Sequence, residues 1–391
     1  MKKVIIYSAF ALALSSVCMN GYSQAGYTPR NMSGGTALNN LLMVAPDSRS
    51  GGMGDVGVAT SPDVYSQHWN PAKYAFIEED AGFSMSYVPW NRKLVNDEYL
   101  IALSGFKRID RSQAFGFGLK YSSLGLYDWT DYEGNSLGSD RPSELSVDVS
   151  YTRMLSDYLS AAVAFRYLRY DYKFESDVAK EKAGGFATDV ALFYNRPVYI
   201  GGNYGTWAFG VNLSNIGPKM RYLSNDDKRF IPTNLRIGTS IGTEFAYDHE
   251  ISFSLDFNKL LVPTPPIRNI NDPLIIDKGK DDNVSAIKGI FQSFGDAPGG
   301  FSEELKEIGM NCGAEYWYKK TIAVRSGYAY QDAGKGYQKY FAMGVGARYN
   351  NFGLDISYLT TSKTNPLAEA LRFSFLYTFA SRPNTAPASL R

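Results

Sequence analysis

The sequence has few of the residues on which disulfides and acid–base catalysis depend. Its 391 residues include two cysteines and two histidines. Cys18 lies at the end of an N-terminal apolar stretch, and removal of that stretch would leave Cys312 as the only cysteine, which excludes an intrachain disulfide. A histidine-dependent active site would have to use His68 or His249.

Long apolar runs and an excess of one charge are also missing. After residue 20 no uninterrupted apolar run approaches the roughly 18 residues of a membrane-spanning helix, which excludes that class of membrane protein. The 40 basic and 39 acidic residues leave a net charge of +1, and this balance predicts no nucleic-acid partner. Aromatic residues, in contrast, are plentiful, with 29 tyrosines and 23 phenylalanines.

The N-terminus has the features of an export signal. Lys2 and Lys3 precede an apolar stretch at residues 4–17, and small residues follow it. This order predicts a secretory signal peptide over residues 1–25. A lipoprotein anchor at Cys18 is the weaker alternative, because the bulky residue before it does not suit lipid attachment.

Large apolar side chains alternate with small or charged ones along most of the remaining chain. In residues 371–379, Phe373 and Phe375 lie on one face and Arg372 and Ser374 on the other, which is typical of a strand. A tilted strand of about 9–11 residues can cross a bilayer, where lipid covers the apolar face. About fourteen such segments predict an all-β protein, a transmembrane antiparallel β-barrel over residues 78–379. The other segments are residues 83–87, 99–103, 115–121, 145–151, 159–167, 186–194, 207–213, 235–241, 251–257, 310–318, 322–330, 341–349 and 352–358.

The connections between these segments support a barrel. In an outer-membrane barrel, short periplasmic turns alternate with longer external loops, whereas a soluble β-sandwich has no reason to sort its loops in this way. The expected turns are residues 153–157, 246–250, 319–321 and 350–351, and the expected loops are residues 122–144, 171–185, 215–233, 259–308 and 360–370. Residues 195–205 are predicted to be an unusually long turn.

The inward faces of the predicted strands carry charges of both signs. Charges on neighbouring strands can pair across a sheet, and an interior that excludes water makes pairing necessary. We therefore expect ion pairs that tie the wall to material inside it, in preference to the lining of a selective pore. The charges are Lys120, Asp148, Arg166, Asp189, Arg236, Asp256, Glu315, Arg325, Arg348, Asp355 and Arg372.

Residues 26–77 lack the strand pattern and are rich in Gly, Ser, Asn and Asp. We expect a compact, irregular plug inside the barrel, in which Asn70 and Pro71 fix a turn and Trp69 packs beside them. The glycines of residues 51–57 lack the Lys-Ser/Thr pair of a phosphate-binding loop. Residues 380–391 are expected to form a C-terminal tail.

An ordered set of short motifs resembles one family of outer-membrane proteins. G-M-G at residues 52–54 and N-P-A at 70–72 resemble the plug of FadL-type proteins, which are fourteen-stranded barrels. Longer segments are similar to the PorV family, the FadL-like component of the type IX secretion system. These segments are V-N-L-S-N-I-G-P (211–218), P-T-N-L-R-I-G (232–238), D-F-N-K-L-L-V-P (256–263) and F-Q-S-F-G-D-A-P-G-G-F-S-E-E-L (291–305).

This resemblance implies a carrier in the outer membrane, in contact with its lipid. Proteins of this family receive the C-terminal signal domain of a secreted cargo protein from the type IX translocon. They deliver it to a cell-surface attachment complex that comprises the PorU sortase, PorQ and PorZ. The resemblance implies no cofactor and no metal.

The longest connection, residues 261–305, is the predicted partner site. Its length far exceeds the roughly 12–15 residues beyond which a loop usually has a function or is disordered. Residues 284–294 are predicted to form a helix with an apolar stripe of Ile287, Ile290, Phe291 and Phe294. A turn at residues 296–300 and a second short helix from Phe301 follow. The predicted partner-binding residues are Phe291, Phe294, Asp296 and Phe301, although the loop could also simply cap the barrel rim.

Two other functions remain as alternatives. A FadL-like channel for hydrophobic ligands would be favoured by detergent or lipid bound inside the barrel. A lipopolysaccharide-modifying enzyme would require His68 or His249 at a substrate-exposed site. The acidic cluster at residues 277–283 could bind Ca²⁺, but it lacks the spacing and glycine of a calcium-binding loop, so a solvated acidic loop is favoured.

Overall fold

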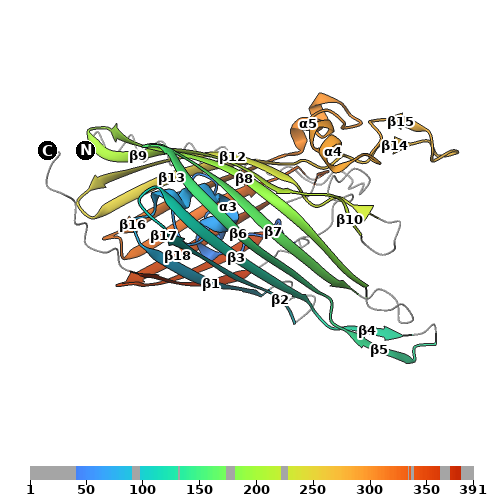
Figure 1. The fold of residues 1–391 in the computed structure, drawn as a ribbon, viewed down its shortest axis with the longest axis horizontal. Coiled ribbons are helices and arrows are strands. Elements are labelled where there is room, and N and C mark those ends of the chain that lie inside the picture. Colours follow the sequence, from blue (N-terminus) through green and yellow to red (C-terminus); the bar gives the residue numbers. More distant parts are fainter. Residues whose placement is uncertain are drawn as a thin grey trace. The chain divides into compact units, whose positions relative to one another are not determined.

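The computed structural model describes residues 41–89, 97–130, 133–172, 181–221, 228–332, 334–335, 339–361 and 370–379. Within them, fourteen antiparallel strands form one closed barrel, as the alternation predicts (Figure 1). Each strand pairs with its neighbours in chain order, and the last strand closes the barrel against the first. The expected signal peptide and the C-terminal tail lie outside the described residues, as do residues 26–40 of the expected plug.

The barrel strands are β1 (Ala81–Pro89), β2 (Glu98–Arg108), β3 (Gln113–Leu124), β6 (Ser143–Ser156), β7 (Leu159–Tyr172), β8 (Glu181–Ile200), β9 (Asn203–Ile216), β12 (Asn234–Ala246), β13 (His249–Leu260), β16 (Ile308–Tyr318), β17 (Ile322–Tyr330), β18 (Lys339–Tyr349), β19 (Phe352–Thr361) and β20 (Leu371–Phe379). Three small hairpins lie in the connections: β4 (Tyr127–Thr130) with β5 (Ser136–Asp140), β10 (Met220–Arg221) with β11 (Lys228–Arg229), and β14 (Ile267–Arg268) with β15 (Ile276–Lys278). The described helices are α2 (Ser48–Gly51), α3 (Ser66–Trp69), η3 (Pro71–Phe76), α4 (Ala286–Gln292) and α5 (Phe301–Lys306).

The alternation places apolar side chains on the outside of the barrel. In β20, Phe373 and Phe375 are exposed, whereas Arg372 and Ser374 are buried. Exposing such an apolar exterior to water would cost free energy, whereas the hydrocarbon of a bilayer covers it without that cost. No helix in the described part of the chain is both long and apolar enough to cross a membrane.

The short turns lie at one end of the barrel, and one of them differs from the expectation. The long turn predicted at residues 195–205 is wrong, because β8 and β9 continue to Ile200 and Asn203. Gly201 and Gly202, with φ of 60° and 87°, form the two-residue link. A tight hairpin turn of this kind requires positive φ at both positions, which glycine adopts readily. This hairpin lacks the apolar alternation beyond residue 194, so the sequence pattern did not extend the strands.

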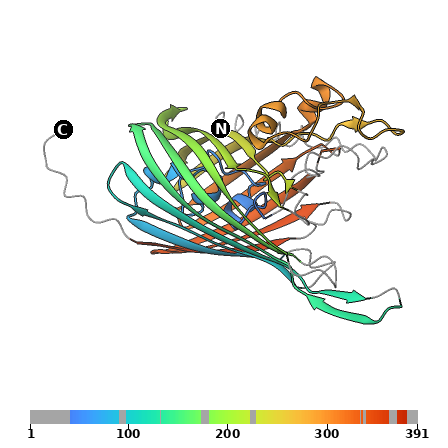
Figure 2. The ribbon, with the colours of Figure 1, turned by 45° about the vertical axis from the view of Figure 1, so that its right-hand side comes forward.

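The described N-terminal segment, residues 41–77, lies within the ring of strands (Figure 2). Its backbone is hydrogen-bonded to the wall: the Asp256 carboxylate accepts from the amides of Gly57 and Val58 at 2.7 and 3.0 Å. The Asn311 side chain donates to the Gly54 carbonyl at 2.6 Å. These contacts make the segment a part of the barrel interior.

Glycines of the wall allow this close approach. A Cβ atom added to Gly327 of β17 would lie 2.0 Å from the carbonyl carbon of Met53, and one added to Gly313 of β16 would lie 2.5 Å from its oxygen. Both distances are far below van der Waals contact, so any side chain at either position would displace the segment. The barrel wall is thus shaped for backbone-to-backbone packing.

We predict that Gly327→Val will loosen the N-terminal segment and leave the barrel closed. Valine suits a strand, but overpacking of this kind costs about 1–3 kcal/mol or more. Limited proteolysis should cleave residues 41–77 faster in the variant, and heating in detergent should unfold it earlier. Gly184→Ala is the control, because its added Cβ would have no neighbour closer than 3.5 Å. Equal proteolysis of the two variants would contradict the close packing.

Candidate functional site

Buried ion pairs join the N-terminal segment to the barrel wall. Arg325 of β17 contacts Glu315 of β16 at 2.7 Å and Asp355 of β19 at 2.8 Å. Arg348 of β18 reaches the same Asp355 at 2.8 Å. Arg49 of the segment contacts Glu315 at 2.7 Å. The predicted pairing of inward-facing charges is thus confirmed in this part of the barrel.

Two further groups of ion pairs lie elsewhere in the interior. Arg166 of β7 contacts Asp148 at 3.4 Å and Asp189 at 2.8 Å, on the two neighbouring strands. Arg372 of β20 contacts Asp55 of the segment at 2.7 Å. Removal of one partner from a buried ion pair leaves an uncompensated charge. The segment and the wall therefore stabilise each other through charges that neither could bury alone.

The predicted plug residues occupy the centre of this packing. Trp69 is 1% exposed, and its indole N–H donates to Asp47 at 2.6 Å. Asn70 caps η3: its side chain accepts from the Ala72 amide at 3.0 Å and donates to the carbonyl of Leu192 in β8 at 2.9 Å. Pro71 begins η3, where a missing backbone N–H costs nothing.

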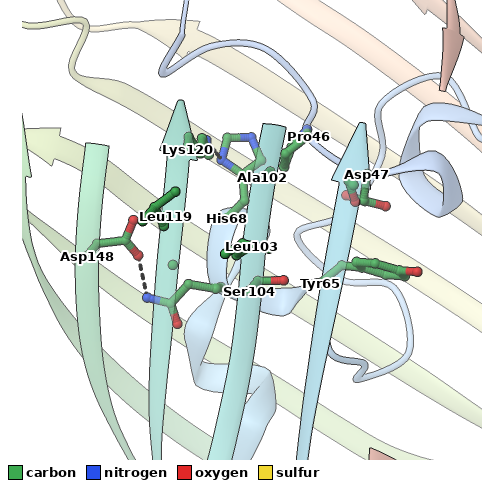
Figure 3. A pocket seen from close by; sticks show the side chains of 13 residues that line it. Pro46, Asp47, Tyr65, His68, Ala102, Leu103, Ser104, Leu119, Lys120 and Asp148 are labelled. Atoms are coloured by element: carbon green, nitrogen blue, oxygen red, sulfur yellow. Dashed lines mark hydrogen bonds between the residues drawn. The ribbon is translucent and has the colours of Figure 1, made fainter. Parts of the chain in front are cut away.

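His68 lies beside a small interior cavity of about 20 Å³ (Figure 3). Its Nδ1 is 2.6 Å from Lys120 Nζ. Burial, followed by the positive charges of Lys120, Arg236 and Arg166, lowers the pKa of His68 well below 6.5. Lys120 already occupies Nδ1 as a hydrogen-bond partner inside the protein.

His249, unlike His68, belongs to the barrel wall, where it is the first residue of β13 next to a short turn. Its Nδ1 is 2.7 Å from the hydroxyl of Tyr316, and its ring packs with Phe245 and Tyr318. The two histidines therefore belong to separate environments, and the part of the chain described by the structure does not combine them in one site.

The acidic cluster at residues 277–283 is organised by a basic residue. Arg268 contacts Asp282 at 2.7 Å and Asp281 at 3.8 Å, while Asp277 accepts from Asn269 at 3.2 Å. Among the described residues, no group of three potential ligands is placed to hold a metal ion.

The long connection, residues 261–307, contains both helices predicted for it and will be called the helical loop. α4 and α5 project beyond the end of the barrel opposite the short turns (Figures 1 and 2). Phe291, Phe294 and Phe301 are 74%, 54% and 77% exposed, and Ile287 and Leu305 are also exposed. The structure thus brings three of the four predicted partner-binding residues onto the surface of one loop.

Asp296, the fourth predicted residue, is buried and differs from the other three. It is 1% exposed, and its carboxylate accepts from the Thr264 amide at 3.2 Å. Burial, followed by the charges of Glu304 and Glu307, raises the pKa of Asp296 to about 6, although the Thr264 hydrogen bond lowers it. Asp296 therefore holds the loop together and does not present a contact surface.

Sequence reasoning missed the residues that hold the helical loop against the rim. Lys259 contacts Glu307 at 2.5 Å and Glu304 at 3.0 Å, and Lys335 contacts Glu307 at 2.9 Å. The only signal in the sequence is the set of closely spaced carboxylates at residues 303–307. This set of carboxylates does not reveal which basic residues pair with it, because the lysines lie far away in the chain.

Comparison with solved structures identifies the fold. The CymD monoaromatic hydrocarbon channel shares 13% identity, with 87% of this chain and 99% of that chain covered and a TM-score of 0.50. The toluene transporter TbuX of Ralstonia pickettii has 12% identity, coverages of 88% and 100%, and a TM-score of 0.49. A Pseudomonas aeruginosa FadL homologue has 11% identity, coverages of 86% and 98%, and a TM-score of 0.42. The likeness to CymD is one of fold alone, and the two lower scores carry no further argument.

Sequence comparison identifies the family. A search of curated proteins gives no match. The family model described as "Type IX secretion system protein PorV" matches residues 29–267, which is more than half of the chain. The closed barrel with its apolar exterior places the protein in the bacterial outer membrane. The chain belongs to the PorV family of type IX secretion system proteins.

Proposed function

We propose that the protein is a cargo carrier of the type IX secretion system. It binds the C-terminal signal domain of a secreted protein at the translocon and delivers it to the attachment complex with PorU, PorQ and PorZ. The observation that carries the proposal is the exposed apolar surface of the helical loop. Family membership supports the pathway, and the loop supplies a surface suited to a protein partner.

The position of the helical loop agrees with this role. Short turns of an outer-membrane barrel face the periplasm and long loops face the cell exterior, so we infer that α4 and α5 lie outside the cell. Phe291, Phe294 and Phe301 are exposed aromatic residues on this loop, of the kind that anchors protein interfaces. Exposed aromatics on an external loop are costly in water, and a cargo domain would cover them.

We further propose that residues 41–77 act as a plug. Arg49 and Asp55 of the segment satisfy buried charges of the wall, and Trp69 is enclosed with them. The cavities beside His68 are about 20 and 10 Å³, which is room for single water molecules. Close packing of this kind around His68 suits a carrier that keeps the membrane sealed.

The alternative of a hydrophobic-ligand channel rests on the fold shared with CymD. Ligand channels need an apolar path, whereas the described interior is lined by ion pairs such as Arg325–Asp355. We also propose no catalysis, because His68 is enclosed beside Lys120 in the interior and His249 packs among aromatic rings. The carrier function therefore remains our proposal.

Replacing the three exposed phenylalanines should weaken cargo capture. We expect the triple variant Phe291→Ala, Phe294→Ala and Phe301→Ala to assemble normally, because these side chains are exposed on the loop and do not belong to a barrel strand. Its affinity for an isolated cargo signal domain should fall by at least about 100-fold, since each of the three interface anchors contributes on the order of 1–2 kcal/mol. Titration of the detergent-purified protein with the signal domain would measure this change.

A matched control uses exposed aromatics at the other end of the barrel. Tyr199 and Tyr247, which are 81% and 92% exposed, flank or form short turns. Their replacement by alanine should leave the affinity unchanged. Undiminished binding by the triple phenylalanine variant would remove the helical loop from the cargo site.

Removing residues 49–72 should open the barrel to small solutes. Wall charges that lose Arg49 and Asp55 would then be hydrated, so the empty interior would fill with water. We expect measurable ion conductance in planar bilayers for the deletion variant and almost none for the intact protein. Equal conductance of the two forms would show that the segment is not a plug.

The helical loop should dock more tightly as the pH falls from 7.5 to 5.5. Its docked state raises the pKa of Asp296 from 3.8 to about 6, so this state binds the proton more strongly than the open loop. The stabilisation is present at low pH and is lost as the pH rises through 6. Linkage predicts that the opening equilibrium decreases on the order of fourfold over this range.

Hydrogen–deuterium exchange of residues 296–307, corrected for intrinsic rates, would measure the opening. Asp296→Asn should abolish the difference between the two pH values, because it removes the titrating proton. A pH dependence that persists in this variant would assign it to another group.

A further inference from the structure

Helix α5 exposes apolar side chains and buries a charged one, which is the reverse of an ordinary surface helix. Phe301 and Leu305 are exposed, whereas Glu304 is buried. The helix is only six residues long, and Gly300 at its N-cap provides no side-chain hydrogen bond. Such a short helix is not stable by itself, so its position must come from contacts with the rest of the protein. Apolar packing cannot supply them, because the apolar side chains point outward.

Charged side chains from three parts of the chain supply these contacts. Lys259, at the end of β13, contacts Glu304 at 3.0 Å and Glu307 at 2.5 Å. Lys335, in the connection between β17 and β18, contacts Glu303 at 2.6 Å and Glu307 at 2.9 Å. Both lysines are less than 10% exposed. We call these five residues the charge clamp.

Two neighbouring interactions complete the clamp. The hydroxyl of Thr264 donates to Glu307 at 2.6 Å. The other oxygen of Glu304 accepts from the amides of Asp296 and Ala297 at 2.7 and 2.8 Å, which fixes the turn before α5. Burial opposes the ionised form of Glu307, but hydrogen bonds from Lys259, Thr264 and Lys335 outweigh it and lower the pKa of this carboxyl.

We propose that Lys259 and Lys335 are positioning residues for partner binding, which rests on the function proposed above. Buried ion pairs add little net stability compared with apolar packing, but each pair is satisfied in one geometry only. The clamp therefore fixes the direction in which α5 presents Phe301 and Leu305. A partner that meets this preset surface does not have to order the loop on binding, which preserves affinity.

The test compares Lys335→Met and Lys259→Met with the native protein and uses two measurements. Hydrogen–deuterium exchange of residues 300–307 reports whether α5 stays docked. Titration with an isolated cargo signal domain reports affinity. Removing either ammonium leaves buried carboxylates unpaired, so exchange should rise, and affinity should fall on the order of tenfold. Lys335→Arg, which keeps the charge, should restore most of the affinity.

Lys320→Met is the matched control. Lys320 also contacts a glutamate, Glu250, at 3.0 Å, but its side chain is 75% exposed beside a short turn. Exposed pairs of this kind contribute little, so neither measurement should change. Migration of unheated and heated samples in SDS verifies that every variant retains its barrel; if Lys259→Met does not, Lys335→Met decides the question.

Each combination of exchange and affinity results supports or overturns a specific part of the proposal. Unchanged exchange in α5 would overturn the clamp, whatever the affinity. Raised exchange with native affinity would overturn its role in positioning. In that case the triple phenylalanine variant separates the two proposals: if it also binds normally, the proposed cargo site has failed, and if it binds weakly, only the positioning role has failed.

Discussion

The pairing of buried charges between the wall and the N-terminal segment is the constraint on which the rest of the structure depends. Glu315 lies between Arg325 of the wall and Arg49 of the segment, and its carboxylate accepts hydrogen bonds from both guanidinium groups. Burying unpaired charges in an interior without water would cost more free energy than the net stability of a typical domain. The barrel can therefore have an apolar exterior and a charged interior only because the segment fills it.

The same constraint explains how the two surfaces differ. Along each strand, lipid covers the outward residues and the segment contacts the inward ones. The alternation of apolar and polar residues therefore suits both environments. The helical loop lies beyond this arrangement. There, charges are again buried and apolar groups are exposed, and within the described parts of the chain these apolar side chains remain on the surface. An exposed surface of this kind, held by a specific charge cluster, is consistent with a site reserved for a partner.

Much of the fold could be predicted from the sequence, because alternation is a local pattern. All fourteen strands were predicted, as were the two helices of the loop, since their apolar residues recur at regular spacing. The β8–β9 hairpin was missed beyond residue 194, where pairing continues without an apolar stripe. Phe291, Phe294 and Phe301 were found from their spacing, whereas the burial of Asp296 was not. Lys259 and Lys335 could not be found, because only tertiary contacts relate them to α5.

Closure of the barrel between β1 and β20 has a consequence for biogenesis. These two strands are the first and last of the sheet, so the ring cannot be completed until the final strand has been made and delivered. The segment that fills the ring precedes β1 in the chain. The segment leads directly into β1, the first strand of the seam. An assembly machine that completes the seam therefore receives the wall and the segment that fills it as one connected chain.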